Sequence, residues 1–382
     1  MSSTLSRTST ADKIEKLRRV MEARGLDAVV VCSYQNVSYF GGTTIMTQVN
    51  LPDRLAFLVA RRDGAATLLV CSIETSQVRS QTDIADIRDY TEFAQDPTVE
   101  LARLLRDLGL SNGSIGLDAR RLPAASMATL EAEMSSLELI PIDDEIELAQ
   151  AVKEPGEIDA LRGAGNATLS ALEQGLIDLP PGCTERQAAS AIYSKLLDRG
   201  GMPLFMVFAS GERTMQGHPE SVDIPMAPGS IWRIDFGARF AGGINSDLAR
   251  TGVVGQATPE QTATLAALRA TQDAGFAAIE SGRPAKEVFF AVQDEFRRQG
   301  LPFAMPHIGH GMGIGLHEYP MLQPRCDIPL QVGMVLNIEP MTLIGERGEG
   351  YHTEDLAVVM DGAPAQLLTP PQERLLIIPD QA

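Results

Sequence analysis

Carboxylate side chains stand within apolar, strand-like runs in the second half of this 382-residue chain. Asp235, Glu339 and Glu354 each lie in or at the end of such a run. A carboxylate buried in a strand costs several kcal/mol unless it is paired or bound to a metal. We therefore expect these strands to fold only where the acids meet a compensating positive charge.

A fourth acid and a histidine-rich segment belong to the same pattern. Asp247 follows Gly242 and Gly243, as if a hairpin returned it beside Asp235. Residues 306–318 interleave four glycines with His307, His310 and His317, a composition that no regular helix tolerates. All five histidines lie between His218 and His352. Imidazole chemistry is therefore confined to the second half of the chain.

These side chains favour a metal site. Oxygen ligands with a single imidazole suit Mn²⁺, Co²⁺ or Fe²⁺ better than a thiolate-rich zinc site. Four carboxylates also balance the charge of two divalent ions. No GK[ST] sequence follows the glycine-rich segment, so it is not a phosphate-binding loop.

Composition excludes several other classes. The net charge of −18 makes nucleic acid and anionic membranes poor partners. Four dispersed cysteines are too few for a disulfide scaffold, and the N-terminal segment has no apolar signal core. We expect a cytoplasmic protein without membrane spans.

The pattern of helices and strands predicts two domains. Residues 1–145 form an α/β domain, and residues 146–382 form an α+β catalytic domain, with the linker near residues 143–156. In the first domain we expect helices at 11–24, 99–108 and 124–134, and strands at 28–32, 55–59, 66–71, 114–118 and 137–142. In the second we expect helices at 157–176, 185–199, 259–281 and 285–299, and strands at 204–209, 230–236, 248–254, 334–340 and 356–360. Two rounds of helix, helix and strands would form one sheet with the helices outside it.

Taken together, these residues resemble a known family. The motifs GHGMGIGLHE, NIEP and TED, with the five side chains Asp235, Asp247, His310, Glu339 and Glu354, resemble the metallopeptidases that include aminopeptidase P, prolidase and methionine aminopeptidase. The resemblance implies the duplicated "pita-bread" fold for the catalytic domain. It covers nearly the whole chain, because VCSYQNVSYFGG resembles the creatinase-like N-terminal domain of these proteins. It also implies a homodimer.

The resemblance implies a role for each site residue. Asp235 would hold one metal, Asp247 and Glu354 would bridge two, and His310 and Glu339 would complete the second. Mn²⁺ is the first choice, with Co²⁺, Fe²⁺ or Zn²⁺ as alternatives. A metal-bridging hydroxide would attack the substrate.

Further roles follow for the side chains around the metals. Glu339 would also shuttle the proton. His218 and His317 would line the substrate site and stabilise the oxyanion. His307 is expected to support or pack against the site.

Two departures from the family pattern affect this interpretation. The interval from Asp235 to Asp247 is one residue longer than usual, which predicts a β-bulge in the hairpin. His352 stands where prolidase-like members usually carry an arginine that can meet a substrate carboxylate. Histidine is shorter and only partly charged at neutral pH, which argues against a strict X-Pro dipeptidase.

The leading hypothesis is a binuclear metallohydrolase that cleaves X-Pro peptide bonds. An alternative keeps the metals but acts on a small non-peptide compound, as a compatible-solute hydrolase or a dimethylsulfoniopropionate lyase would. A third hypothesis, a non-catalytic binding module, conflicts with the complete ligand set.

Overall fold

The structure is a computed structural model that describes residues 9–51, 53–177 and 179–380. Residues 1–8, on which the expected lack of a secretion signal partly rests, lie outside the described residues. The chain divides into two compact units, one ending at Gln150 and the other beginning at Ala151. Among the helices described, none has both the length and the apolar character needed to cross a bilayer.

The first unit is built on a six-stranded mixed sheet with the order β4-β3-β2-β1-β5-β6. Its strands are β1 (Ala28–Val31), β2 (Phe57–Arg61), β3 (Ala66–Cys71), β4 (Asp86–Tyr90), β5 (Gly113–Leu117) and β6 (Leu137–Pro141). Its helices are α1 (Thr10–Arg24), α2 (Tyr34–Gly41), α3 (Met46–Asn50), α4 (Thr75–Gln81), α5 (Pro97–Asp107), α6 (Ala124–Glu133) and α7 (Asp143–Ala151). A hairpin turn at Asp63-Gly64 joins β2 to β3, and Gly64 has the positive φ that such a turn needs. The sequence patterns did not predict the short elements α2, α3, α4 and β4, and α7 occupies most of the segment expected as the linker.

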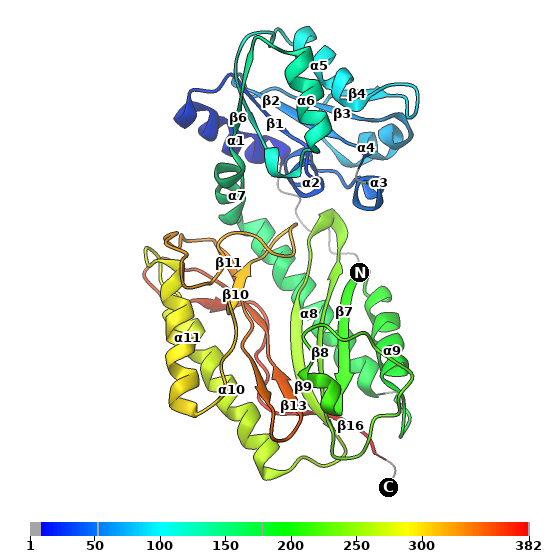
Figure 1. The fold of residues 1–382 in the computed structure, drawn as a ribbon, viewed down its shortest axis with the longest axis vertical. Coiled ribbons are helices and arrows are strands. Elements are labelled where there is room, and N and C mark those ends of the chain that lie inside the picture. Colours follow the sequence, from blue (N-terminus) through cyan, green and yellow to red (C-terminus); the bar gives the residue numbers. More distant parts are fainter. Residues whose placement is uncertain (1–8, 52, 178, 381–382) are drawn as a thin grey trace. The chain divides into compact units, whose positions relative to one another are not determined.

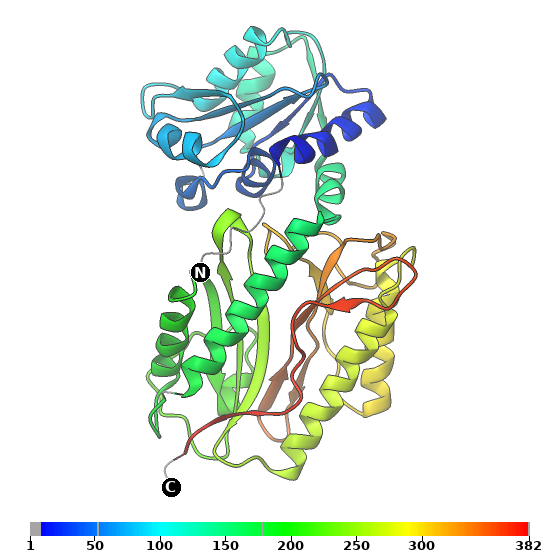
Figure 2. The ribbon, with the colours of Figure 1, turned by 180° about the vertical axis from the view of Figure 1, so that it is seen from behind.

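The second unit repeats one plan twice, as expected. Its first round is α8 (Pro155–Ile177), α9 (Glu185–Leu197), β7 (Met202–Ser210), β8 (Ile231–Arg239) and β9 (Leu248–Val254). Its second round is α10 (Pro259–Ala278), α11 (Ala285–Gln299), β10 (Gly309–Gly311), β11 (Val335–Ile338) and β14 (Asp355–Val358). The additional strands are β12 (Met341–Ile344), β13 (Glu349–His352), β15 (Gln366–Leu367) and β16 (Leu376–Ile378). The α+β class with a duplicated helix–helix–strand pattern is confirmed (Figures 1 and 2).

The expectation of one continuous sheet is wrong. The described strands form two four-stranded sheets, β16-β9-β8-β7 and β10-β11-β14-β15, and a separate β12–β13 hairpin. Between the two larger sheets, an isolated antiparallel bridge pairs Ala249 with Glu354. Each round buries one sheet face on its own helix pair, so the two sheets meet edge to edge rather than merging.

The helix starts follow their sequence signals. Thr258 caps α10, Pro259 occupies its first position, and Gln261 completes a capping box. The side chains of Thr184 and Gln187 form the same box at α9.

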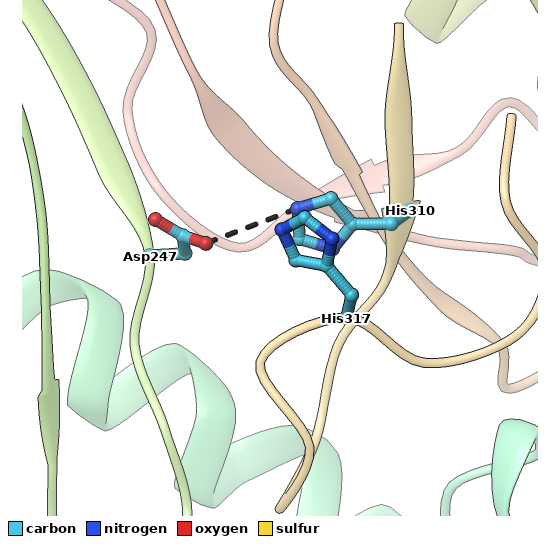
Figure 3. Close-up of side chains that lie close together, drawn as sticks. All are labelled: Asp247, His310 and His317. Atoms are coloured by element: carbon cyan, nitrogen blue, oxygen red, sulfur yellow. Dashed lines mark ion pairs between the residues drawn. The ribbon is translucent and has the colours of Figure 1, made fainter. Parts of the chain in front are cut away.

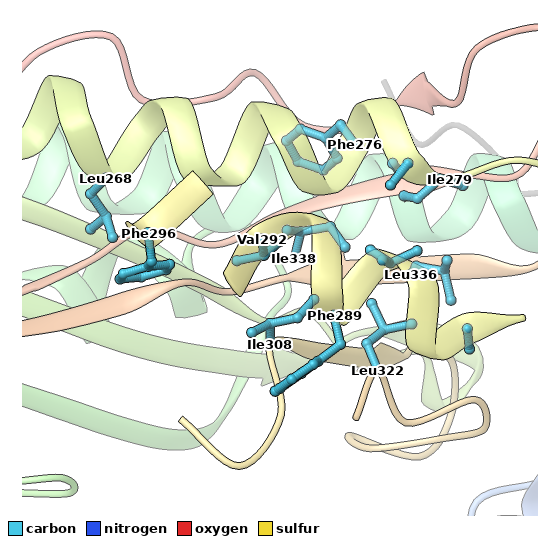
Figure 4. Close-up of a cluster of buried hydrophobic side chains, with 14 of the residues drawn as sticks. Leu268, Phe276, Ile279, Phe289, Val292, Phe296, Ile308, Leu322, Leu336 and Ile338 are labelled. Atoms are coloured by element: carbon cyan, nitrogen blue, oxygen red, sulfur yellow. The ribbon is translucent and has the colours of Figure 1, made fainter. Parts of the chain in front are cut away.

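Because side chains alternate along a strand, the core residues and the candidate site residues of β8 lie on opposite faces of the sheet. Along β8, Trp232, Ile234 and Phe236 join the core formed with α8 and α9. The alternate residues Arg233 and Asp235 therefore lie on the opposite face, away from these helices. The second sheet does the same with α10 and α11, where its core includes Leu336 and Ile338 of β11 (Figure 4). In the second sheet the opposite face is partly covered as well, because Leu161 of α8 packs with Val335, Leu356 and Val358.

The core under α11 offers a test of this packing. Phe296 is fully buried, whereas Phe290 on the same helix is 41% exposed. We expect Phe296→Ala to lower the free energy of unfolding by about 3–5 kcal/mol, because it leaves a cavity. Phe290→Ala should cost less than about 1 kcal/mol. Urea unfolding followed by the fluorescence of the single tryptophan, Trp232, measures both; equal losses would contradict the assigned packing.

Candidate metal centre

Three acids from separate strands converge on one point. Asp235 lies within β8, Asp247 immediately precedes β9, and Glu354 lies between β13 and β14. One carboxylate oxygen from each of the three lies within 4.8 Å of the others. The antiparallel pairing of β8 with β9 brings the two aspartates together, and the Ala249–Glu354 bridge adds the glutamate.

A second group shares Glu354 with the first. His310 comes from β10 and Glu339 directly follows β11, and their ligand atoms and one from Glu354 also lie within 4.8 Å of one another. His310 Nε2 is 3.6 Å from Glu339 Oε1 and 3.8 Å from Asp247 Oδ2. The structure therefore brings all five predicted ligands together in two adjoining groups.

The hairpin that carries the aspartates has no bulge. β8 and β9 keep one register from the Ile231–Val253 pair to the Phe236–Leu248 pair, and the Arg239–Asn245 bridge continues it. The predicted bulge is therefore wrong. The connection is a tight turn in which Gly242 and Gly243 have φ values of 79° and 81°, so the turn accommodates the longer interval.

The tautomer of His310 suits a metal ligand. Its Nδ1 lies 3.0 Å from the carbonyl oxygen of Gly311, which can only accept a hydrogen bond. Nδ1 therefore carries the proton, and the lone pair of Nε2 faces the carboxylates. Burial lowers the pKa of His310 to about 4, so the ring is neutral at pH 7.

The carboxylates are buried without enough hydrogen bonds. Asp247 Oδ1, Glu339 Oε1 and Glu354 Oε2 have no hydrogen-bond partner among the described residues, and neither does His310 Nε2. Such unsatisfied atoms are rare in protein interiors and call for a ligand.

The protonation behaviour points in the same direction. Burial, followed by the charge of Glu339, raises the pKa of Asp235 to about 7. Burial and neighbouring carboxylates hold the pKa values of Asp247 and Glu354 well above the usual range. Burial also disfavours the charged form of Glu339, but His307 Nδ1, 3.3 Å away, helps to lower its pKa to about 2. Four ionised carboxylates need about four positive charges here, and two divalent ions would supply them.

Buried polar contacts hold the ligand strands in place. Asn337 on β11 donates a hydrogen bond to the Glu354 carboxylate. Arg250 Nη2 lies 2.6 Å from Asp355 Oδ1, and Nη1 donates to the carbonyl oxygen of Glu354. This ion pair ties β9 to β14 beside the predicted ligand.

The remaining histidines surround the ligand groups. His317 stacks on His310 with ring centroids 4.0 Å apart, and it forms a further group with His310 and Asp247 (Figure 3). His307 contacts Glu339, as the expected supporting role requires. His352 is buried, with Nε2 3.8 Å from Glu339 Oε2 and Nδ1 4.0 Å from Asp235 Oδ2.

A cavity of about 500 Å³ opens over these side chains. One part of its wall is polar, formed by Gly217, His218, Arg233, Asp235, Asp247, His307, His317, Glu339, His352 and Glu354. The other part is mostly apolar, formed by Phe205, Pro302, Ala304, Met305, Pro306, Leu316, Met341 and Leu343. A short chain with one apolar group fits such a cavity.

Sequence analysis missed three residues that shape this site. Arg233 lines the cavity, Asn337 hydrogen-bonds Glu354, and Arg250 pairs with Asp355. The period of two along β8 could have placed Arg233 on the face of Asp235. The contacts of Asn337 and Arg250 depend on strand pairing, which a single sequence does not reveal.

Family comparisons match both units. The model of metallopeptidase family M24 matches residues 159–361, and that of the creatinase/prolidase N-terminal domain matches residues 13–152. The chain belongs to metallopeptidase family M24. It is therefore a metal-dependent hydrolase, and the resemblance identified from the sequence is confirmed.

Individual relatives align with nearly all of the chain. An Xaa-Pro dipeptidase of Pyrococcus furiosus is 26% identical over 368 residues, covering 96% of this chain and 99% of the relative. An uncharacterised peptidase of Bacillus subtilis is also 26% identical, covering 96% of this chain and all of the relative. Among solved structures, a dipeptidase of Mycobacterium ulcerans matches with a TM-score of 0.81 and 26% identity, covering 99% of this chain and all of that one. An X-Pro aminopeptidase of Thermotoga maritima shares the fold, with a TM-score of 0.84 at 22% identity and coverage of 96% and 99%.

Glu354 belongs to both ligand groups, and its role in each can be tested by measuring metal content. We expect Glu354→Ala to lose at least one ion per chain, because the remaining side chains no longer complete either group. Glu346→Ala, a change at an exposed position, is the control. Elemental analysis after dialysis measures both variants, and wild-type metal content in Glu354→Ala would exclude a bridging role.

Proposed function

We propose that this enzyme hydrolyses X-Pro bonds at the N-terminus of short peptides with two divalent ions. The proposed ligands are Asp235, Asp247, His310, Glu339 and Glu354. The observation that carries the proposal is the pair of ligand groups sharing Glu354 beside a cavity with both polar and apolar walls. Relatives named Xaa-Pro dipeptidase support the choice of bond.

In the proposed reaction, the metal ions would activate a water molecule, and side chains of the protein would transfer protons and bind the substrate. Divalent ions bound there would lower the pKa of a water molecule and polarise the scissile carbonyl. The side chain of Glu339 lines the cavity and is 13% exposed, so it can reach both solvent and substrate. We assign it the transfer of a proton to the leaving proline nitrogen.

Two histidines are proposed to bind the reacting carbonyl. His218 and His317 both line the cavity and are exposed, so a substrate can reach their N–H groups. Hydrogen bonds to the oxyanion are worth about 3–4 kcal/mol in comparable sites. The apolar part of the wall would hold the proline ring or the preceding side chain.

The proposed metal and the proposed location of the enzyme follow from its metal ligands and its cysteines. Oxygen-rich ligation with one imidazole favours Mn²⁺, with Co²⁺, Fe²⁺ or Zn²⁺ as alternatives. All four cysteines are free and buried, which suits the proposed cytoplasmic location. The homodimer stays a prediction from the family resemblance.

The direct test is an activity assay at known metal content. Protein loaded with Mn²⁺ should cleave alanyl-proline or a longer X-Pro peptide and leave matched X-Ala peptides intact. Chelation should abolish the activity, and added Mn²⁺ should restore it. No turnover of any X-Pro peptide by metal-loaded protein would exclude the proposal. Turnover of creatine, ectoine or dimethylsulfoniopropionate would instead favour the non-peptide alternative.

His352 is proposed as a substrate-binding residue at a position that cannot accept a larger side chain. It is 4% exposed, and burial lowers its pKa to about 4, so it is neutral at pH 7. We expect His352→Arg to raise KM about tenfold or more on dipeptides and longer peptides, because the larger cation overfills the wall. Steady-state kinetics at equal metal occupancy measures this. A gain confined to dipeptides would contradict it.

A further inference from the structure

Arg233 is a buried cation in the wall of the cavity that the proposed mechanism does not use. It lies two residues before Asp235 on β8, on the same face of the strand. Its side chain is 1% exposed, and it lines the cavity with Gly217, His218 and His352. The guanidinium is therefore within the site and shielded from bulk water.

Part of this guanidinium is occupied by the backbone. Nε donates to the carbonyl oxygen of Thr214 at 2.9 Å, and Nη2 donates to Gly217 at 2.8 Å and also to Gln216. No described residue accepts a hydrogen bond from Nη1. Three carbonyl oxygens thus fix the orientation of the side chain and leave one of its nitrogens available.

Arg233 also lacks a carboxylate partner. Two arginines are buried among the described residues, and the other, Arg250, lies 2.6 Å from Asp355. No described carboxylate lies within 4.0 Å of Arg233. A buried cation without a partner is costly, so the site favours a ligand that brings a negative charge.

We propose that Arg233 binds the free carboxylate of a substrate's C-terminal proline, which makes the enzyme selective for dipeptides. This inference rests on the proposed X-Pro function and specifies its substrate class. In an X-Pro dipeptide the carboxylate lies one residue beyond the scissile carbonyl. Residues two apart on a strand are about 7 Å apart, so Arg233 is at a suitable distance from the ligand Asp235.

Charge balance supports this assignment. Two divalent ions would cancel the four carboxylates, and among the described residues no other arginine or lysine lines the cavity. A substrate carboxylate would then neutralise Arg233, and guanidinium N–H groups bind carboxylates with defined geometry.

The test compares a free carboxylate with its neutral amide. The substrates are alanyl-proline and alanyl-prolinamide, and the variants are Arg233→Met and Arg233→Lys. We expect Arg233→Met to reduce kcat/KM for the acid about 100-fold, mainly through KM. The change for the amide should stay within about threefold. Arg233→Lys should retain part of the preference for the acid, because it keeps the charge.

A matched control separates binding from loop support. Arg213 also holds the segment before His218, through Glu185 and the carbonyl oxygen of Glu220, but it does not line the cavity. Arg213→Met should change both substrates by the same factor. An equal loss on acid and amide in Arg233→Met would show that Arg233 only supports this segment, and would overturn the inference.

Calorimetric binding of the same two compounds gives a readout without turnover. Metal-free wild-type protein should bind the acid more tightly than the amide, and Arg233→Met should abolish the difference. No preference for the acid in the wild type overturns the inference, whether or not turnover is observed. Metal-loaded protein that cleaves no X-Pro peptide contradicts the proposed function separately.

Discussion

The burial of four carboxylates in one small volume is the constraint on which the catalytic unit depends. Asp247 and Glu354 are almost fully buried, and Asp235 and Glu339 keep only 15% and 13% of their side chains exposed. Without added positive charge, burial and mutual repulsion favour the protonated forms of Asp235, Asp247 and Glu354. The oxygens that lack hydrogen bonds are the atoms that the proposed metal ions would bind.

The proposed metal ligands lie where the two four-stranded sheets of the second unit meet. Each sheet covers one face with its own helices, so the opposite face can carry polar residues at alternate positions. The Ala249–Glu354 bridge and the Arg250–Asp355 ion pair hold the sheet edges together. Because the proposed ligands come from both sheets, metal binding would also stabilise this junction.

Sequence patterns predicted most of the longer helices, the long strands and the acids, because each depends on local periodicity. The capping box at Thr258 and the alternation through Asp235 needed no knowledge of the fold. The single continuous sheet and the bulge before Asp247 were wrong, because strand pairing is non-local and glycine turns can accommodate an extra residue. Short elements such as β10 and β13 were missed, since they have too few residues to show a period.

The two buried arginines show how similar side chains on neighbouring strands come to differ in role. Arg250 lies on β9 and forms an ion pair with Asp355, so it helps to hold the two sheets together. Arg233 lies on β8 with backbone carbonyl oxygens as its only hydrogen-bond partners among the described residues, so its charge stays available to the cavity. Since His352 is neutral at pH 7, the fixed positive charge of the cavity wall comes from β8 rather than β13. If Arg233 binds the substrate carboxylate as proposed, neighbouring positions of one strand would serve the metal ions and the substrate, because Arg233 and Asp235 share the face of β8 that lines the cavity.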